Sequence, residues 1–281
     1  MKNDILIHLA NVSADIVRVP ILRGVNADLN KGNIIAVVGR NGAGKTTLLR
    51  TIMGLIRPKE GQILFEGADL ARVPAHGRAR LGIGYAPQER VMFPTLSIEE
   101  NLRLPCQVAG MNKREVDERL AMTLEVVAQL KPMLNRSGAA LSGGQGKMAA
   151  LGRALMIGSK LILLDEPFQG LAPALATEYS NALKQLQQRV PDLCIVVTES
   201  NGSLLKDVPD HVLHIERGNC HLSSIPAAKL VPTQLTICQW RHNHEHALHR
   251  RPQSPCYWRA EHSCLLTCHW RGVCRNRPGH A

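Results

Sequence analysis

The glycine-rich stretch at residues 39–46, GRNGAGKT, constrains this chain more than any other feature. It fits the pattern G-x-x-x-x-G-K-[ST] and lies between a β-branched run at 34–38 and a helical pattern at 45–55. Glycines let successive backbone N–H groups curl around phosphate oxygens, and the helix that starts there adds its positive dipole end. The pattern therefore predicts a phosphate-binding loop on a strand–loop–helix unit.

Two side chains of this loop indicate which ligand it holds. Lys45 can reach the β- and γ-phosphates of a nucleotide, and the Thr46 hydroxyl can bind Mg²⁺. We therefore expect ATP and Mg²⁺ as cofactors. The residues expected to contact the nucleotide are Gly39, Arg40, Asn41, Gly42, Ala43, Gly44, Lys45, Thr46 and Thr47.

A second motif is the apolar run at 161–164, which ends in Asp165 and Glu166. At the tip of a strand, Asp165 can hold the Mg²⁺ shell, and Glu166 can polarise the attacking water as a general base. Two acids after a strand are weak evidence alone, but they become a strong signal once a phosphate loop precedes them.

Strand-like and helical patterns alternate along the chain. Strands are expected at 5–10, 34–38, 61–65, 161–164 and 194–198, and helices at 45–55, 99–104, 114–130, 142–156 and 176–189. This alternation predicts an α/β fold with a mostly parallel sheet and right-handed crossovers. The stretch at about 90–155 is mostly helical and is expected to form a subdomain inserted into that core.

Residues 141–145 read LSGGQ, another glycine-rich helix start with free N–H groups and a Ser hydroxyl available to an anion. Placed between the phosphate loop and the acidic strand, this pentapeptide resembles the signature of ATP-binding cassette (ABC) ATPases, which have a P-loop NTPase core. In that family the signature of one cassette covers the γ-phosphate held by a second cassette. The resemblance implies that nucleotide is also bound by Ser142, Gly143, Gly144 and Gln145.

Other positions fit the same resemblance, which covers about residues 5–220. Gln88 resembles the family's Q-loop, which touches Mg²⁺ and contacts the membrane subunit, and residues 170–173 stand where its D-loop lies. The resemblance implies a catalytic set of Lys45, Gln88, Glu166 and Ser200, and a Mg²⁺ set of Thr46, Gln88 and Asp165. We expect residues 1–225 to form the cassette.

The motifs RTIMGL at 50–55, GIGY at 82–85 and EENL at 99–102 resemble importer cassettes for branched-chain amino acids, or the related urea and amide branch. This implies membrane permeases, a second cassette and, indirectly, a periplasmic or extracellular binding protein as partners. It places the chain peripherally at the cytoplasmic face of the inner membrane. The alternatives are a degenerate cassette with little turnover and a non-transport cassette acting on nucleic acid, although no nucleic acid is expected.

Three positions depart from the family pattern. The stretch at 13–18 lacks the aromatic residue that stacks on adenine, so Ile16 or a neighbour is left to offer apolar contact. Ser200 stands where a switch His is expected, and Gly146 and Lys147 follow the signature where glutamine-like residues are common. We therefore expect hydrolysis, at a reduced rate.

Composition agrees with a folded ATPase whose membrane role comes through partners. The apolar fraction of 44% is enough for a packed core. No apolar run approaches the ~18 residues that span a bilayer, and the first residues lack the layout of a signal peptide. We expect a cytoplasmic body whose cysteines stay thiols.

The last part of the chain, 226–281, is a basic extension rich in Cys, His and Trp, expected to be disordered or unrelated to the cassette. From residue 231 onward it has seven Arg against two acids. Its Cys264, Cys268 and Cys274, beside His262 and His269, match no strong zinc pattern. Binding to nucleic acid, anionic lipid or metal is the weaker alternative, and a reading-frame slip in the gene would also explain the abrupt change.

Overall fold

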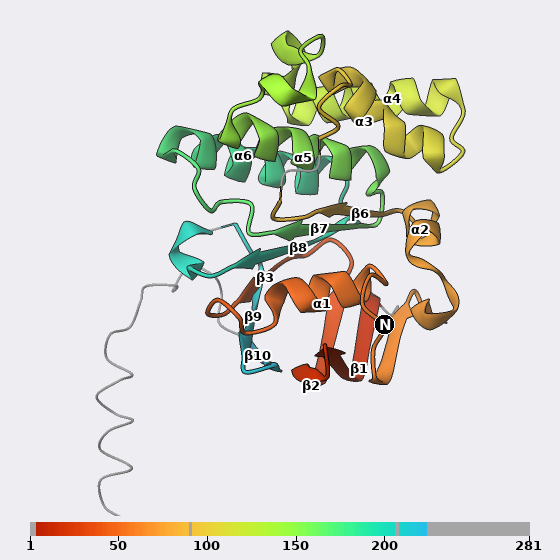
Figure 1. Ribbon diagram of the computed structural model, residues 1–281, viewed down its shortest axis with the longest axis vertical. Coiled ribbons are helices and arrows are strands. Elements are labelled where there is room, and N and C mark those ends of the chain that lie inside the picture. Colours follow the sequence, from red (N-terminus) through yellow and green to blue (C-terminus); the bar gives the residue numbers. More distant parts are fainter. Residues whose placement is uncertain (1–3, 90–91, 206–207, 224–281) are drawn as a thin grey trace, which may run out of the picture. The chain divides into compact units, whose positions relative to one another are not determined.

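A computed structural model describes residues 4–89, 92–205 and 208–223 (Figure 1). The predicted extension at 226–281 lies outside these residues. The described part contains a six-stranded sheet of order β10-β9-β3-β8-β7-β6 and a four-stranded sheet of order β2-β1-β4-β5. The predicted α/β fold with a mostly parallel sheet is confirmed.

The six-stranded sheet brings the ends of the predicted motifs to one edge. Its strands are β3 (Ile34–Val38), β6 (Ile83–Ala86), β7 (Leu161–Asp165), β8 (Cys194–Glu199), β9 (His211–Glu216) and β10 (Asn219–Ser223). All neighbours pair in parallel except β9 and β10. Val38 pairs with Glu199, and Asp165 pairs with Thr198. The phosphate loop therefore follows β3 and the two acids end β7, on either side of β8 and at the same end of the sheet.

The four-stranded sheet is antiparallel and built around one long hairpin. Its strands are β1 (Ile5–Ile16), β2 (Val19–Asn30), β4 (Glu60–Phe65) and β5 (Ala68–Asp69). The hairpin turns at Val17 and Arg18, whose φ angles are +48° and +64°. Such turns usually use Asn-Gly or Asp-Gly, so the sequence held no hairpin signal and the expected strand at 5–10 was too short.

Six α-helices and five short 3₁₀ helices connect the strands in the described residues. The α-helices are α1 (Lys45–Ile52), α2 (Ala75–Arg78), α3 (Ile98–Val108), α4 (Lys113–Val126), α5 (Gly143–Ile157) and α6 (Pro173–Arg189). The 3₁₀ helices are Leu70–Arg72, Ala79–Leu81, Ala128–Met133, Gly138–Ala140 and Gly202–Leu204. None of the helices in the described ranges is long and apolar enough to cross a bilayer.

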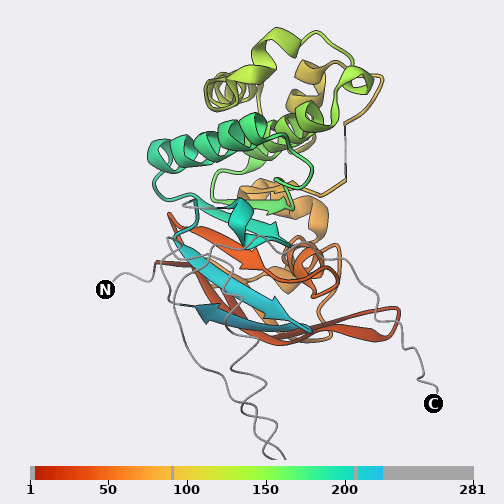
Figure 2. The ribbon, with the colours of Figure 1, turned by 90° about the vertical axis from the view of Figure 1, so that its left-hand side faces the viewer.

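The helices cover the two faces of the six-stranded sheet unequally. Helices α5 and α6 lie on one face with α3 and α4 beyond them, whereas α1 lies on the other face, between the two sheets (Figure 1). The view turned by 90° shows the same layers, with the long hairpin β1–β2 farthest from α6 (Figure 2).

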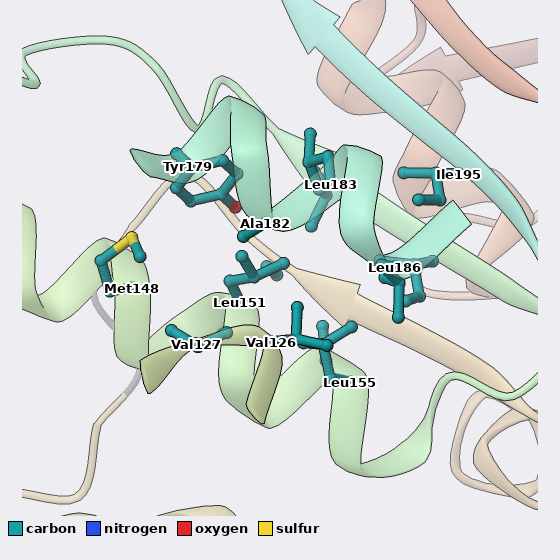
Figure 3. Packing of buried hydrophobic residues seen from close by; sticks show 14 of the residues in the cluster. Val126, Val127, Met148, Leu151, Leu155, Tyr179, Ala182, Leu183, Leu186 and Ile195 are labelled. Atoms are coloured by element: carbon teal, nitrogen blue, oxygen red, sulfur yellow. The ribbon is translucent and has the colours of Figure 1, made fainter. Parts of the chain in front are cut away.

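Two apolar cores result from the alternation of side chains along the strands. Ile34 and Ala36 of β3 join the core under α3–α6, while Ile35 and Val37 join the core around α1 and the hairpin. Figure 3 shows the first core from close by, where side chains of α5 and α6 pack against one another. Those it labels on these two helices are Met148, Leu151, Leu155, Tyr179, Ala182, Leu183 and Leu186.

Two predicted helices end earlier than expected. The helix expected at 45–55 stops at Ile52, because Gly54 follows with a φ of +73°. The helix expected at 114–130 stops at Val126 and continues as a 3₁₀ segment that contains Pro132. Both differences lie at the ends of helices, where single-sequence patterns are least informative.

Candidate nucleotide site

The phosphate loop leaves β3 and enters α1 through glycines that its path requires. A Cβ on Gly39 would lie 2.3 Å from the Ile215 carbonyl oxygen of β9. Gly44 caps α1 with a φ of +114°, a conformation that residues with a Cβ rarely adopt. The backbone therefore curls closely over the start of α1, which is the cradle that a phosphate group needs.

Lys45 is held inside this loop. Its Nζ donates hydrogen bonds to the carbonyl oxygens of Gly39, at 2.8 Å, and of Arg40, at 3.2 Å. The same nitrogen lies 3.0 Å from Glu166 Oε1, and the two side chains are only 4% and 6% exposed. A buried ammonium beside a buried carboxylate is stabilised by the pairing, because either charge alone would be costly in this environment.

Asp165 and Thr46 meet as a metal site would require. The Thr46 hydroxyl donates to Asp165 Oδ1 at 3.0 Å, and the Thr198 hydroxyl donates to the same oxygen at 2.8 Å. Oδ2 of Asp165 is buried and has no hydrogen-bond partner among the described residues, and burial raises the pKa of this carboxyl. A carboxylate oxygen left unpaired beside a hydroxyl suits a hard cation such as Mg²⁺, so the residues present fit that ion.

Gln88 reaches the same place from the segment after β6. Its Nε2 donates to Glu166 Oε2 at 3.1 Å and to Gln169 Oε1 at 2.8 Å. Both oxygens of Glu166 are thus engaged, one by Lys45 and the other by Gln88. Gln169 was missed in the sequence because nothing in its neighbourhood distinguishes it from an ordinary loop residue.

A cavity of about 280 Å³ lies among these groups, although Asp165 itself does not line it. Its lining is Ile21, Asn41, Gly42, Gly44, Lys45, Thr46, Thr47, Gln88, Glu166 and Gln169. The structure therefore brings Gln88 and Glu166 together with most of the predicted loop, whereas Gly39, Arg40 and Ala43 line a second cavity. The apolar side chain in this lining is Ile21 of β2, which the sequence did not single out. Ile16, the predicted apolar contact, lies at the hairpin tip and is 41% exposed.

The signature residues stand apart from that cavity. Ser142 caps α5: its hydroxyl accepts from the Gln145 backbone N–H at 3.3 Å, and Gln145 Oε1 accepts from the Ser142 N–H at 3.0 Å. This reciprocal pair is a capping box. Neither of these two residues, nor Gly143 or Gly144, lines the cavity at the phosphate loop.

Ser200 is also separate from the residues that line this cavity. It lies in a second cavity, of about 670 Å³, on the side of the loop formed by residues 38–43. The same cavity is lined by His214 and Arg217, from β9 and the turn after it. His214 was not predicted as a site residue, because the sequence pattern did not indicate a strand at β9.

Behind the site, Glu199 of β8 is completely buried. Its Oε1 accepts from the Phe168 N–H at 2.8 Å, while its Oε2 has no hydrogen-bond partner in the part of the chain that the structure describes. Burial raises the pKa of Glu199 to about 7, with Glu166 adding to the rise; the Phe168 N–H, Lys147 and Lys45 oppose it.

This raised pKa makes the stability depend on pH. In the unfolded state Glu199 loses its proton at the ordinary pKa of Glu, roughly 4.3. Between this pH and the raised pKa, the native state keeps the proton that the unfolded state has lost. The contribution to stability is therefore complete below roughly pH 4.3 and is lost as pH rises through about 7. We expect Glu199→Gln to remove it, so that urea unfolding at pH 5 and pH 8 shows a smaller decrease in the variant. The exposed Glu118→Gln is the control, and equal decreases in variant and wild type would contradict the prediction.

Comparisons with known proteins agree with this geometry. Residues 22–169 match the ABC transporter family. The probable branched-chain amino acid transport ATP-binding protein LivF of Archaeoglobus fulgidus is 34% identical over 198 residues, or 70% of this chain and 83% of the relative. The lipopolysaccharide export system ATP-binding protein LptB of Escherichia coli K12 is 34% identical over 181 residues, or 64% and 74%. The crystal structure of MJ1267, an ATP-binding cassette in its ADP conformation, superposes with a TM-score of 0.71 at 25% identity, over 85% of this chain and 99% of that one. The chain therefore belongs to the ABC transporter family, as an ATP-binding and ATP-hydrolysing cassette.

Proposed function

We propose that this cassette binds ATP with Mg²⁺ at the phosphate loop and drives a membrane importer for branched-chain amino acids or a related small amide. The observation that carries the site assignment is the meeting of Lys45, Thr46, Asp165 and Glu166 at one sheet edge. Four residues from two distant segments converge there with the donor and acceptor types that nucleotide hydrolysis uses.

Each group has a role that its contacts support. The loop N–H groups and Lys45 bind the β- and γ-phosphates, and Lys45 must exchange its contacts with loop carbonyls and Glu166 for phosphate oxygens. Thr46, Asp165 and Gln88 would hold Mg²⁺, which when bound supplies positive charge to the phosphate oxygens. Glu166, held by Gln88 on its other oxygen, accepts a proton from the attacking water. Ser200, which lines the second cavity beside the loop, is the remaining member of this set, as a contact for the γ-phosphate.

The signature supports a dimeric site. Residues 142–145 form a capped helix start that stands outside the cavity of their own chain. A second cassette, arranged head to tail, would place this helix start over the nucleotide of its partner, where the positive helix dipole end stabilises phosphate charge. ATP binding would then close the dimer, and hydrolysis would reopen it.

The cargo and location rest on resemblance. Motifs at 50–55, 82–85 and 99–102, and the relative LivF, favour import of branched-chain amino acids. LptB, whose name states lipopolysaccharide export, has the same 34% identity to this chain as LivF, so export is the competing function. We propose residues 1–225 as the cassette, with a helical subdomain at 90–155 and a separate extension at 226–281. Permease subunits, served by an external binding protein, would hold it peripherally at the cytoplasmic face of the inner membrane.

Lys45→Ala tests the ATP site. We expect the dissociation constant for ATP to rise by about 100-fold, since a buried, charge-assisted contact with phosphate is worth roughly 3 kcal/mol. Equilibrium binding of ATP by the full chain measures this, and exposed Lys184→Ala on α6 serves as the control. An unchanged affinity with a folded variant would contradict the assignment of the loop.

The transport assignment needs a separate experiment. Deleting the gene should abolish uptake of radiolabelled leucine or urea, and the full chain should co-purify with integral membrane proteins from detergent extracts. Retained uptake together with lipopolysaccharide held in the inner membrane would favour the export function. Co-purification with DNA or ribosomes would favour a non-transport cassette.

A further inference from the structure

Lys147 makes a contact that connects the signature helix to the candidate general base. It lies in the first turns of α5, two residues after Gln145. Its Nζ donates a hydrogen bond of 2.7 Å to the backbone carbonyl oxygen of Glu166. The only other hydrogen bond given to this oxygen within the described part of the chain is a long one, 3.4 Å, from the Gln169 N–H. A single side chain of α5 is thus the main partner of this peptide group.

The Glu166 peptide needs such a partner because its conformation is unfavourable. Its φ is +45°, in the left-handed region that residues with a Cβ seldom adopt. On its N-terminal side the Glu166 N–H donates to Thr198, to the hydroxyl at 3.0 Å and to the backbone carbonyl oxygen at 3.2 Å. Lys147 holds the carbonyl on the other side. The backbone of Glu166 is therefore fixed from β8 and from α5, while Lys45 and Gln88 hold its carboxylate.

The surroundings show that Lys147 is not an ordinary surface lysine. It is half-buried and lines a cavity of about 170 Å³ with Gln88 and Gly170. Burial lowers the pKa of its ammonium, against the attraction of Glu199, Glu166 and Asp165. A long flexible side chain pays entropy to be held here, so its contacts must offset that cost.

We propose that Lys147 is a positioning residue for ATP hydrolysis, which ties the first turns of the signature helix to the Glu166 peptide of the same chain. This rests on the proposed roles of Glu166 and of residues 142–145. In the head-to-tail dimer, the signature of a chain serves its partner's nucleotide, while its Glu166 serves its own. Lys147 therefore connects the two nucleotide sites through one side chain. When α5 moves as its signature binds the partner's nucleotide, the orientation of the Glu166 carboxylate at its own nucleotide changes.

The test compares three substitutions in the full chain. We expect Lys147→Met to lower kcat by at least about 10-fold, the value of a charge-assisted hydrogen bond, with ATP affinity changed less than about 2-fold. Lys147→Arg keeps a charged donor and should recover most of the rate. Lys184→Met, on an exposed part of α6, should leave kcat and KM unchanged. If the Met variant does not fold, Lys147→Leu, which also lacks a hydrogen-bond donor, replaces it with the same expectation.

The same substitution in the Glu199→Gln variant shows whether Lys147 positions Glu166 or only compensates the charge of Glu199. In Glu199→Gln the buried charge is gone, so a purely compensating Lys147 would be dispensable there. We expect Lys147→Met still to lower kcat by about 10-fold in that background. The proposal would be overturned if the double variant had the same kcat as Glu199→Gln, or if Lys147→Met alone had the same kcat as the wild type. Glu166→Gln is measured beside it: turnover retained in that variant would instead refute the general-base role on which the proposal rests.

Discussion

Glu166→Gln is expected to lower ATP turnover by about 10²–10⁴-fold, the range that general base catalysis contributes, while ATP still binds. The amide has nearly the shape of the carboxylate and can still accept the hydrogen bond from Gln88, whose Nε2 lies 3.1 Å from Oε2 in the wild type. It cannot take a proton from water. It also removes the negative partner of Lys45, at 3.0 Å, and so frees the ammonium for phosphate.

Two measurements on the full chain check this result. Phosphate release at saturating ATP reports turnover, and light scattering reports whether an ATP-bound dimer accumulates, because closure without hydrolysis should trap it. Glu118→Gln, an exposed acid of α4, should behave as wild type. Unchanged turnover in Glu166→Gln would refute the base assignment, and loss of ATP binding would show that Glu166 acts in binding instead.

The second large effect concerns stability, at a residue behind the site. Arg78, at the end of α2, is only 5% exposed. Its guanidinium donates to the carbonyl oxygens of Leu70, at 2.8 Å, and of Val73 and Thr51, each at 3.2 Å, and also to that of Ile52. The last two belong to the C-terminal end of α1, the negative end of the helix that carries Lys45 and Thr46.

Arg78→Met should therefore lower the free energy of unfolding by about 3–5 kcal/mol, because it leaves four inward-facing carbonyl groups without their charged donor. Arg78→Lys should lose less, since three ammonium hydrogens can reach some of the four oxygens. Urea unfolding at pH 7 measures both. Arg80→Met, two residues away and exposed, should change stability by less than about 0.5 kcal/mol. A value for Arg78→Met as small as that of the control would contradict this account.

What could be predicted from the sequence was local and chemical. The phosphate loop and the two acids at the end of β7 are short runs in which each residue type has a fixed role, so they indicated a nucleotide site. The resemblance of residues 141–145 to the ABC signature then implied an ATPase cassette. The alternation of strands and helices predicted the mostly parallel sheet. Asp165 and Thr46 were expected to share a cation, and the structure places their side-chain oxygens 3.0 Å apart.

The missed strands show where local patterns stop. Gly84 lies in the middle of β6 and weakens its strand signal, yet a Cβ there would lie 2.2 Å from the Ala154 carbonyl oxygen of α5. The glycine is required by a neighbour 70 residues away, which no window of sequence contains. In the same way Val17 and Arg18 adopt the positive φ angles of the hairpin turn, which residues with a Cβ disfavour, because the paired strands on both sides hold them there.

By itself the sequence of residues 39–46 determined that this chain binds phosphate, because loop and helix start are contiguous and need no other element. It also determined the order of the acids and the signature along the chain. Only the tertiary structure decided that Lys45 pairs with Glu166, that Ile21 lines the cavity and that Lys147 reaches the Glu166 carbonyl. These contacts join residues from different elements, and their geometry depends on how sheets and helices pack, which is a property of the whole core.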